Sequence, residues 1–326
     1  MKPRIFLPTW KLTTLRGWPT NTELNPAYIS VFVFAFQFGL MYGDVGQGLV
    51  ILALGFIFTK KFKSGMLKYL GGLFIPMGIA ATIFGFIYGS IFLNETILEA
   101  FYHPIMPNPI HQTTKLLLLV FQIAAIEIIC GLCIGAYNQI KKGNPVGALG
   151  EHGLGMILYV GGLYMTAMYF ISIGMNFMQA LSYWGFYVML IGLGLSFLEP
   201  VIHSIQHGHG VGVESIGEGI GGFLMTFVEG LANLFSYLRI AAFALAHASL
   251  AIAAEALNVA LPLSLFGLSI PAGLILMNVV ALSFELISST VQSLRLLYYE
   301  FMGKFFDGQG VPFKPFKLSR DRRISP

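Results

Sequence analysis

The sequence predicts an all-α fold, a polytopic membrane helical bundle of about eight transmembrane helices with the last two long and strongly tilted. Its composition is the first reason: 56% of the 326 residues are hydrophobic and only 10% are charged, whereas soluble domains carry roughly 25% charged residues. The second reason is that apolar blocks of about 20 residues, long enough to cross a bilayer as helices, recur along the chain. The third is that most basic residues lie between these blocks.

The first apolar block predicts two helices or one long one. It covers 27–59, a length of about 50 Å as a helix, and its centre is MYGDVGQG (41–48), with three glycines and an aspartate. One tilted helix or two short helices joined by a tight turn would both fit. The remaining blocks are 69–93, 112–140, 149–173, 177–198, 213–258 and 268–307.

Basic residues on both sides of this first block favour the hairpin. The positive-inside rule places clusters of Lys and Arg on the cytoplasmic side, and only a two-helix hairpin returns both flanks there. Eight spans with both termini cytoplasmic follow, and the predicted outer loops 41–46, 94–111, 174–177 and 259–270 contain no Lys or Arg. The flanking residues are Lys2, Arg4, Lys11 and Arg16 before the block and Lys60, Lys61, Lys63 and Lys68 after it.

Five regions are expected along the chain. The last two apolar blocks are long, about 55–60 Å as helices, against a hydrocarbon core of about 30 Å, so they must tilt or extend beyond the membrane. The predicted regions are a cytoplasmic N-terminal segment at 1–26, six transmembrane helices at 27–198, a cytoplasmic loop at 199–221, two long tilted helices at 222–307 and a cytoplasmic tail at 308–326.

Two metal-like or redox-like patterns have simpler explanations. Cys130 and Cys133 form a Cys-x-x-Cys pattern within an apolar block, but no second pair exists, so packing is the favoured interpretation. His203, His207 and His209 have spacing that could bind a metal, but no Cys or acidic cluster joins them. The sequence therefore predicts no metal site and no cofactor.

Arg239 and Arg295 are the basic residues that lie deep within predicted spans. A central arginine costs about 2.5–3.5 kcal/mol on insertion scales, and such residues face the bundle interior or water. A structural salt bridge between helices would be one explanation. A functional ion path is the other, and the neighbouring residues favour it.

Polar residues accompany each arginine at helical spacing. Residues three, four or seven apart lie on one helix face, which places two polar stripes on the two long helices. Packing alone does not require a histidine, two glutamates and two arginines, whereas a proton path needs groups that bond and titrate. The stripes are Asn278, Glu285, Ser288, Gln292 and Arg295 on the last span, and Glu229, Asn233, Ser236, Phe243 and His247, with Arg239 beside them, on the preceding span.

The predicted topology orders these groups by depth. Glu229 and Arg295 fall towards the cytoplasm, His247 and Glu285 towards the outside, and Arg239 between them. One continuous pore would short-circuit a membrane, so we expect two polar half-paths separated by a fixed cation. Asp44, at the hairpin tip, adds an outer carboxylate.

Four stretches carry more specific motifs: FGLMYGDVGQG (38–48), SYLRIAAFALAHASLA (236–251), FELISSTVQSLRLLYYEFMGKFF (284–306) and GVPFKPF (310–316). In order, and over nearly the whole chain, they resemble the membrane half of the stator subunit of rotary V/A-type ATPases, called subunit a or, in archaea, subunit I. The second stretch is typical of the archaeal or bacterial A-type branch. A multi-pass protein of a prokaryotic cell membrane is therefore expected.

The resemblance implies a static subunit whose last two helices pack against a rotating ring of proteolipid c-subunits. Arg239 matches the essential arginine that meets the ring carboxylate between two proton half-channels, and Arg295 matches the second ring-facing arginine. Gln292 stands where eukaryotic relatives often have a histidine, which leaves its titrating role open. The residues implied in the half-channels are Glu285, His247, Asp44, Gln292, Ser288, Glu229, Asn233 and Ser236.

The resemblance also sets the expected partners. These are the c-ring, central-stalk and peripheral-stalk subunits and the lipid membrane, with no nucleic acid. No G-x-x-x-x-G-K-[ST] loop occurs in the sequence, so ATP chemistry would reside in other subunits. Family members carry a large N-terminal cytoplasmic arm, whereas about 26 residues precede the first span here.

Two other functions stay open on sequence alone. An ion-coupled secondary transporter would also place ionisable residues at mid-depth, although it should show inverted repeats, and none is evident. A haem or metal redox protein is a weaker alternative, because His247 has no second histidine at matching depth.

Overall fold

The computed structural model describes eleven stretches of the chain. They are residues 12–14, 16–20, 23–63, 65–94, 112–143, 146–150, 153–206, 213–260, 263–265, 268–270 and 272–311. Two of the three histidines at 203, 207 and 209 therefore lie outside the described residues.

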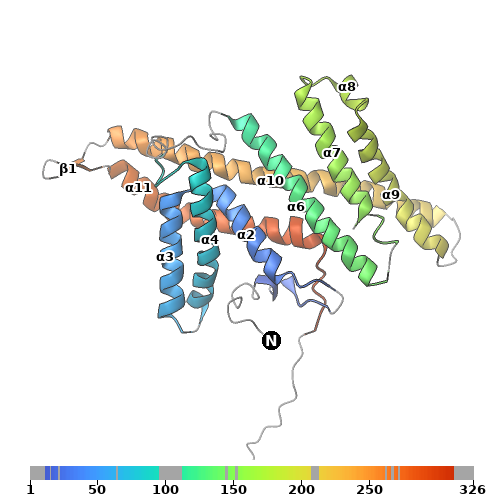
Figure 1. Cartoon of the computed structure of the whole chain (residues 1–326), viewed down its shortest axis with the longest axis horizontal. Helices are drawn as coiled ribbons and strands as arrows, with labels where there is room; N and C mark the ends of the chain where they lie inside the picture. The colour runs from blue at the N-terminus through green and yellow to red at the C-terminus, as the bar shows by residue number, and fades with distance from the viewer. Residues whose placement is uncertain are drawn as a thin grey trace, which may run out of the picture.

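Helices make up almost all of the described structure (Figure 1). In the described part, six of them are long and apolar enough to cross a membrane, and a shorter apolar helix covers 29–42. The predicted all-α membrane bundle is confirmed, although this does not establish a count of eight spans. The main helices are α2 (Ala27–Tyr42), α3 (Val45–Lys61), α4 (Met66–Tyr88), α6 (Thr113–Lys141), α7 (Leu154–Ser172), α8 (Phe177–Leu181), α9 (Trp184–Gln206) and α10 (Val213–Ala260).

The first apolar block is two helices, as the hairpin model predicts. α2 ends at Tyr42, and α3 begins at Val45 with Asp44 as its N-cap. The two helices diverge from this turn, because α3 packs along α4 and α2 contacts α4 and α10 (Figure 1). The glycines near the turn allow this packing: a side chain at Gly85 of α4 would overlap the backbone of Asp44 and Val45.

The long α10 and the last helical run lie side by side along the long axis of the molecule (Figure 1). α10 has 48 residues, about 72 Å at 1.5 Å per residue, and it crosses the shorter helices steeply, as the tilt prediction requires. A small antiparallel pair, β1 (Leu263–Leu265) and β2 (Leu268–Ile270), precedes the last run. That run consists of α11 (Ala272–Val280), η2 (Ala281–Glu285), α12 (Leu286–Arg295), η3 (Leu296–Phe301) and η4 (Met302–Lys304).

Two π-helical segments, η2 and η3, interrupt the last helix. A π turn bonds residues five apart and often marks a functional site. Each one rotates the residues that follow relative to a regular α-helix. The single polar face predicted from regular spacing is therefore divided into segments that face different neighbours.

The predicted loop at 199–221 differs most from the structure. α9 continues through Glu199 to Gln206, and α10 already starts at Val213. Hydropathy marks where a helix stops being apolar, and backbone hydrogen bonding can continue beyond that point. Polar residues at 199–206 and 213–221 therefore extend the helices that they were predicted to separate.

The main apolar core lies where α6, α7 and α10 meet. Tyr159, Tyr237 and Ile240 are fully buried there, together with Ile128 and Leu132 of α6. This core fixes α10 against the bundle, and so fixes the direction of the polar side chains on its other faces.

Candidate functional site

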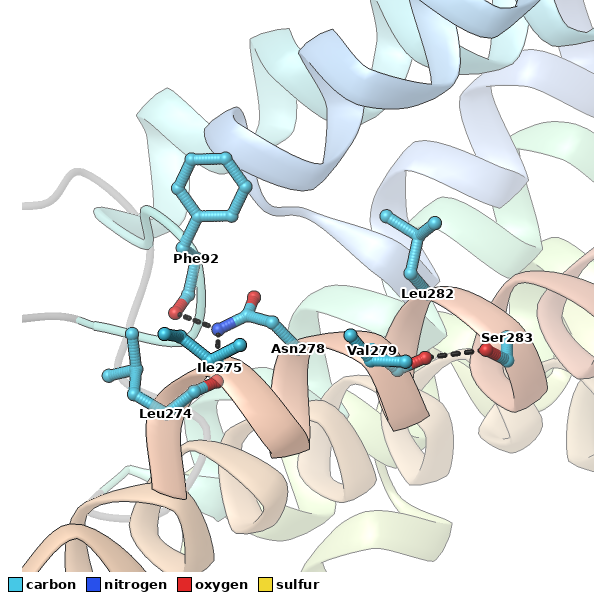
Figure 2. Close-up of a pocket in the computed structure, with 7 residues that line it drawn as sticks. All are labelled: Phe92, Leu274, Ile275, Asn278, Val279, Leu282 and Ser283. Atoms are coloured by element: carbon cyan, nitrogen blue, oxygen red, sulfur yellow. Dashed lines mark hydrogen bonds between the residues drawn. The ribbon is translucent and has the colours of Figure 1, made fainter. Parts of the chain in front are cut away.

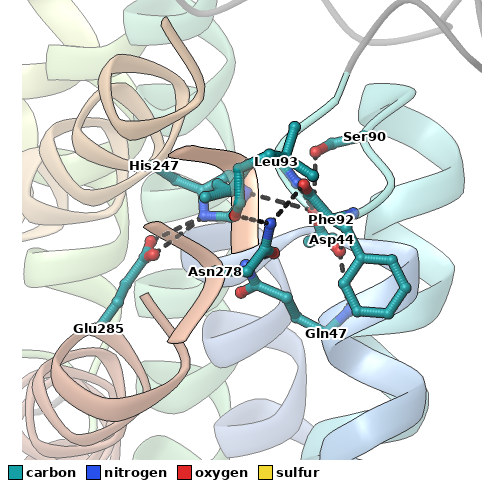
Figure 3. Close-up of polar contacts among 9 residues, drawn as sticks. Asp44, Gln47, Ser90, Phe92, Leu93, His247, Asn278 and Glu285 are labelled. Carbon is teal, nitrogen blue, oxygen red and sulfur yellow. Dashed lines mark hydrogen bonds and ion pairs between the residues drawn. The ribbon is translucent and has the colours of Figure 1, made fainter. Parts of the chain in front are cut away.

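Asp44 is the centre of a buried polar cluster at the α2–α3 turn (Figure 3). Its side chain is fully buried and accepts hydrogen bonds from the Ser90 hydroxyl at 2.9 Å and from three backbone N–H groups, those of Gln47 at 2.9 Å, Phe92 at 3.0 Å and Leu93 at 2.9 Å. Four donors around two oxygens match the acceptor capacity of an ionised carboxylate. Asp44 therefore fastens the start of α3 to the segment after α4.

The segment that Asp44 holds has an unusual backbone. Phe92 and Leu93 have φ values of 50° and 61°, in the left-handed region that residues other than glycine rarely adopt. Such conformations persist where surrounding interactions hold them. Here the two consecutive N–H groups both point at the Asp44 carboxylate (Figure 3), as in the anion-binding nests formed by main-chain amides.

His247 connects this cluster to the last helix. Its Nδ1 lies 2.9 Å from Oε1 of Glu285, and its Nε2 lies 3.8 Å from Oδ2 of Asp44. His247 and Glu285 are 6% and 7% exposed, so the ring sits between two carboxyl groups and away from bulk water. The structure thus brings together three residues that the sequence placed on the same side of the membrane.

Asn278 ties α11 to the same cluster. Its side chain accepts a bond from Gln47 Nε2 and donates to the Phe92 carbonyl, each at 2.8 Å. We call the set Asp44, Gln47, Ser90, His247, Asn278 and Glu285 the Asp44 cluster.

A pocket of about 440 Å³ opens beside Asn278 along α11 (Figure 2). The polar atoms of Asn278 are engaged in the bonds above, and Ser283 bonds to the Val279 carbonyl. The pocket therefore offers mainly apolar side chains, from Phe92, Leu274, Ile275, Val279 and Leu282.

Arg239 is the centre of a second, less complete cluster. Its Nη2 donates to the Ser236 hydroxyl at 3.2 Å, and that hydroxyl donates to Oε1 of Glu300. The shared hydroxyl places Glu300 beside the guanidinium, and Arg295 is a second positive charge that acts on it. Among the described residues, Nη1 of Arg239 has no hydrogen-bond partner and the guanidinium forms no ion pair with a carboxylate.

Four further residues predicted from the sequence lie on α10 and α12. Arg295 and Ser288 are exposed on α12. Asn233 Nδ2 and Gln292 Oε1 are buried atoms without a partner in the described part of the chain. Unpaired buried polar atoms are rare in proteins and often mark water or a functional contact. We call Ser236, Arg239, Gln292, Arg295 and Glu300 the Arg239 cluster.

Glu229 lies apart from this cluster, further towards the start of α10. It forms an ion pair with Lys304 of η4, whose side chain is only 5% exposed. Glu229 is half-buried, so the pair joins a buried lysine to the surface. The predicted polar stripe on α10 therefore divides between two contacts, one to Lys304 and one to Glu300.

An apolar layer separates the Arg239 and Asp44 clusters. Arg239 and His247 are eight residues apart, about 12 Å along the helix axis. Ile240, Ala241 and Ala244 between them are buried and pack with Met41 of α2. An apolar section of the core therefore lies between Arg239 and His247 on α10.

Sequence reasoning missed Glu300, Lys304 and Glu127. Glu300 lies five residues after Arg295, a spacing that the α-helical template ignores and that a π turn joins. Glu127 was passed over within a strongly apolar block. A carboxyl inside a predicted span is itself a signal of function, and that signal could have identified both glutamates. No group of three or more His, Cys, Asp or Glu residues in the described part is arranged to hold a metal ion.

Comparisons with known proteins find similar sequences in one group of membrane proteins. Residues 226–318 match the V-type ATPase 116kDa subunit family, a stretch that holds every predicted site residue except Asp44. The chain is 27% identical over 359 residues to the A-type ATP synthase subunit I of Methanocaldococcus jannaschii, covering 98% of this chain and 49% of that protein. For the Halobacterium salinarum protein of the same name the identity is 26%, over 95% of this chain and 50% of the relative. The chain thus spans about half the length of these relatives.

Proposed function

We propose that this relative of the archaeal A-type ATP synthase subunit I proteins is the static ion-channel subunit of a rotary V/A-type ATPase. Its last two helical runs would face a ring of c-subunits. The Asp44 cluster would serve as the outer proton half-channel and the polar residues Glu229, Asn233 and Ser236 of α10 as the inner one, with Arg239 between them. We further propose that the Asp44 cluster lies on the outer side and that both termini lie in the cytoplasm.

The incomplete bonding of Arg239 carries this proposal. A guanidinium inside a transmembrane helix normally pairs with an acid or faces water. Arg239 has only the Ser236 hydroxyl as a direct partner among the described residues. The carboxylate that completes the site would come from a ring subunit. This explains why a costly charge lies at a partly exposed position.

Arginine suits this task because it stays protonated at physiological pH. A guanidinium favours the deprotonated form of a carboxyl beside it, so each ring carboxyl would release its proton as it reaches Arg239. Arg239 cannot carry that proton across the gap itself. The apolar layer around Ala241 and Ala244 would block direct leakage between the two clusters.

The Asp44 cluster would exchange protons between water and the ring. His247 lies between Asp44 and Glu285, so its two ring nitrogens can each meet a carboxyl. Asp44 is already saturated by donors and lies 3.8 Å from His247 Nε2, so its charge would stabilise the protonated ring without taking the proton. Glu285 would pass the proton between His247 and the passing carboxyl.

Proton pumping by the reconstituted ATPase complex tests this proposal. Arg239→Ala and Arg239→Lys should both abolish ATP-driven pumping in complexes that still assemble. Lys60→Ala, an exposed change at the end of α3, is the control and should pump normally. Coupled pumping by Arg239→Ala at the control rate would refute the proposal, and failure of the chain to co-purify with a c-ring would favour the ion-coupled transporter.

A further inference from the structure

The segment before α2 holds the end of the last helical run. Tyr298 of η3 donates its hydroxyl to the Leu12 carbonyl at 2.8 Å, and the Arg16 guanidinium donates to the Tyr298 carbonyl. Leu12 is 4% exposed and belongs to the same buried apolar cluster as Phe301 and Phe305. One residue of η3 is therefore bonded twice, through its side chain and its backbone, to a segment more than 280 positions earlier in the sequence.

Backbone bonds extend this contact beyond η4. The Trp18 N–H donates to the Gly308 carbonyl at 3.2 Å, and the Gly310 N–H donates to the Trp18 carbonyl at 2.7 Å. A side chain at Gly17 would overlap the Gly308 carbonyl, so the close approach of the two backbone stretches requires a glycine there. We call Leu12, Arg16, Gly17 and Trp18 the N-terminal clasp.

Asn138 of α6 gives the clasp a fixed base. Its Oδ1 accepts a hydrogen bond from the Leu24 N–H at 3.2 Å, and its Nδ2 donates to the Phe305 carbonyl at 2.9 Å. Asn138 is 3% exposed, so bulk water does not compete for these bonds. One buried side chain therefore joins the segment before α2 to the residues that follow η4.

The helical spacing changes twice near Tyr298, and this explains why η3 needs support. In η3 the Met302 N–H bonds to the Leu297 carbonyl, five residues back, whereas in η4 the Phe305 N–H bonds to the Met302 carbonyl, three residues back. Such changes interrupt the regular series of backbone bonds, and π-helical turns are rare and short. A guanidinium that donates to a carbonyl of η3 stabilises the helix at this interruption.

The register of η3 decides where Glu300 points. Glu300 lies two residues after Tyr298 and is 5% exposed, and its Oε1 accepts a hydrogen bond from the Ser236 hydroxyl. That hydroxyl also accepts a bond from Nη2 of Arg239 at 3.2 Å. A return of η3 to regular α-helical spacing would rotate Glu300 relative to α10 and so disturb the group that holds Arg239.

We propose that Tyr298 and Arg16 are positioning residues for proton transport, an inference that rests on the proposed function. Their bonds between η3 and the N-terminal clasp keep η3 in its π-helical register, which holds Glu300 against Ser236 and thereby fixes the direction of the Arg239 guanidinium. Neither residue is hydrogen-bonded to Arg239 in the described part of the chain. Their effect therefore reaches Arg239 only through η3.

Proton pumping by reconstituted complexes tests the two residues separately. Tyr298→Phe removes only the hydroxyl bond to Leu12, and Arg16→Ala removes a donor from an exposed position, which leaves no cavity. Each should lower ATP-driven pumping several-fold in assembled complexes, and Arg16→Lys, which keeps a donor, should retain most of the rate. Tyr187→Phe on α9 and Lys141→Ala at the end of α6 change exposed residues, and these matched controls should pump normally.

A Ser236→Ala background separates positioning from a general loss of stability. If the clasp acts through Glu300 and Ser236, adding Tyr298→Phe to Ser236→Ala should lower pumping no further, because both changes break one chain of contacts. Losses that multiply in the double variant would overturn the inference. Where Tyr298→Phe does not assemble, Arg16→Ala in the same background gives the same test.

The rates of the single variants also distinguish this inference from the proposed function. Pumping at the control rate by Tyr298→Phe and Arg16→Ala, with pumping lost in Arg239→Ala, would refute only the role of the clasp. Normal pumping in Arg239→Ala would refute the proposed function itself.

Discussion

The Asp44 carboxylate and the Arg239 guanidinium, the centres of the two clusters, differ in how completely they are bonded. Asp44 is fully buried with four donors, and His247 is held against Glu285. In the rest of that cluster, Gln47 Oε1 and His247 Nε2 lack a hydrogen-bond partner among the described residues. In the Arg239 cluster, Arg295 is exposed, and one atom each of Arg239, Gln292 and Glu300 lacks a partner within the described residues.

This difference indicates which region depends on a group from another chain. The Asp44 carboxylate keeps its geometry without help, because its four donors are already in place. The Arg239 guanidinium gains stability when a partner supplies the missing bonds. Substitutions in the Asp44 cluster should therefore mainly lower the stability of the fold. Substitutions in the Arg239 cluster should mainly lower the rate of transport, with less effect on stability.

Asp44→Ala should have the largest effect on stability. It leaves the N–H groups of Phe92 and Leu93 and the Ser90 hydroxyl without their acceptor, in a segment whose backbone is already strained. The free energy of unfolding should fall by about 3–5 kcal/mol. Thermal unfolding of the solubilised complex would measure this loss.

Ser249→Ala is the matched control for that change, because Ser249 is exposed on α10 and bonds only within its own helix. An unfolding temperature for Asp44→Ala equal to that of this control would show that the network around the turn adds no stability. It would also remove the contrast between the two clusters.

Ser236→Ala should have a smaller effect on stability and a larger one on transport. It removes the acceptor of Arg239 and a donor to Glu300, in a region where water can replace the lost bonds. The cost in unfolding free energy should be about 1 kcal/mol, whereas the rate of proton pumping should fall several-fold because Arg239 is less well positioned. A stability loss as large as that of Asp44→Ala would contradict the proposed difference.

Lys142→Ala, far from both clusters, should have the smallest effect. Lys142 follows α6 and pairs with Asp307 at 2.8 Å and with Glu23 at 3.6 Å, and both Lys142 and Asp307 are partly exposed. Exposed pairs of this kind contribute less than about 1 kcal/mol. The difference in unfolding free energy between the variant and the parent at neutral pH would measure this contribution.

The pH dependence of that pair has a definite sign. Its hydrogen bond to Asp307 raises the pKa of Lys142 above the usual lysine value. The pair therefore stabilises the folded state fully below the unfolded pKa of about 10.4, and its contribution is lost as pH rises through the folded pKa. A difference in unfolding free energy between variant and parent that grows as the pH rises would contradict this assignment.

Much of the candidate site could be predicted from the sequence. Arg239, His247 and Glu285 stand out because charged groups are expensive inside apolar helices. Their contacts could not be predicted in the same way. The distance from His247 to Glu285 depends on the packing of two helices, and the π segments shift the register on one of them.

The sequence by itself determined the class of the protein, the hairpin at 41–48 and the identity of most polar residues in the spans. These follow from composition and charge, which are properties of short stretches and do not depend on distant contacts. Only the tertiary structure decided that Asp44 is a saturated anchor and that Glu300 lies near Arg239. The physical reason is that hydrogen-bond partners come from distant parts of the chain, as with Tyr298 and Leu12, which are 286 positions apart, and these meet only after the helices have packed.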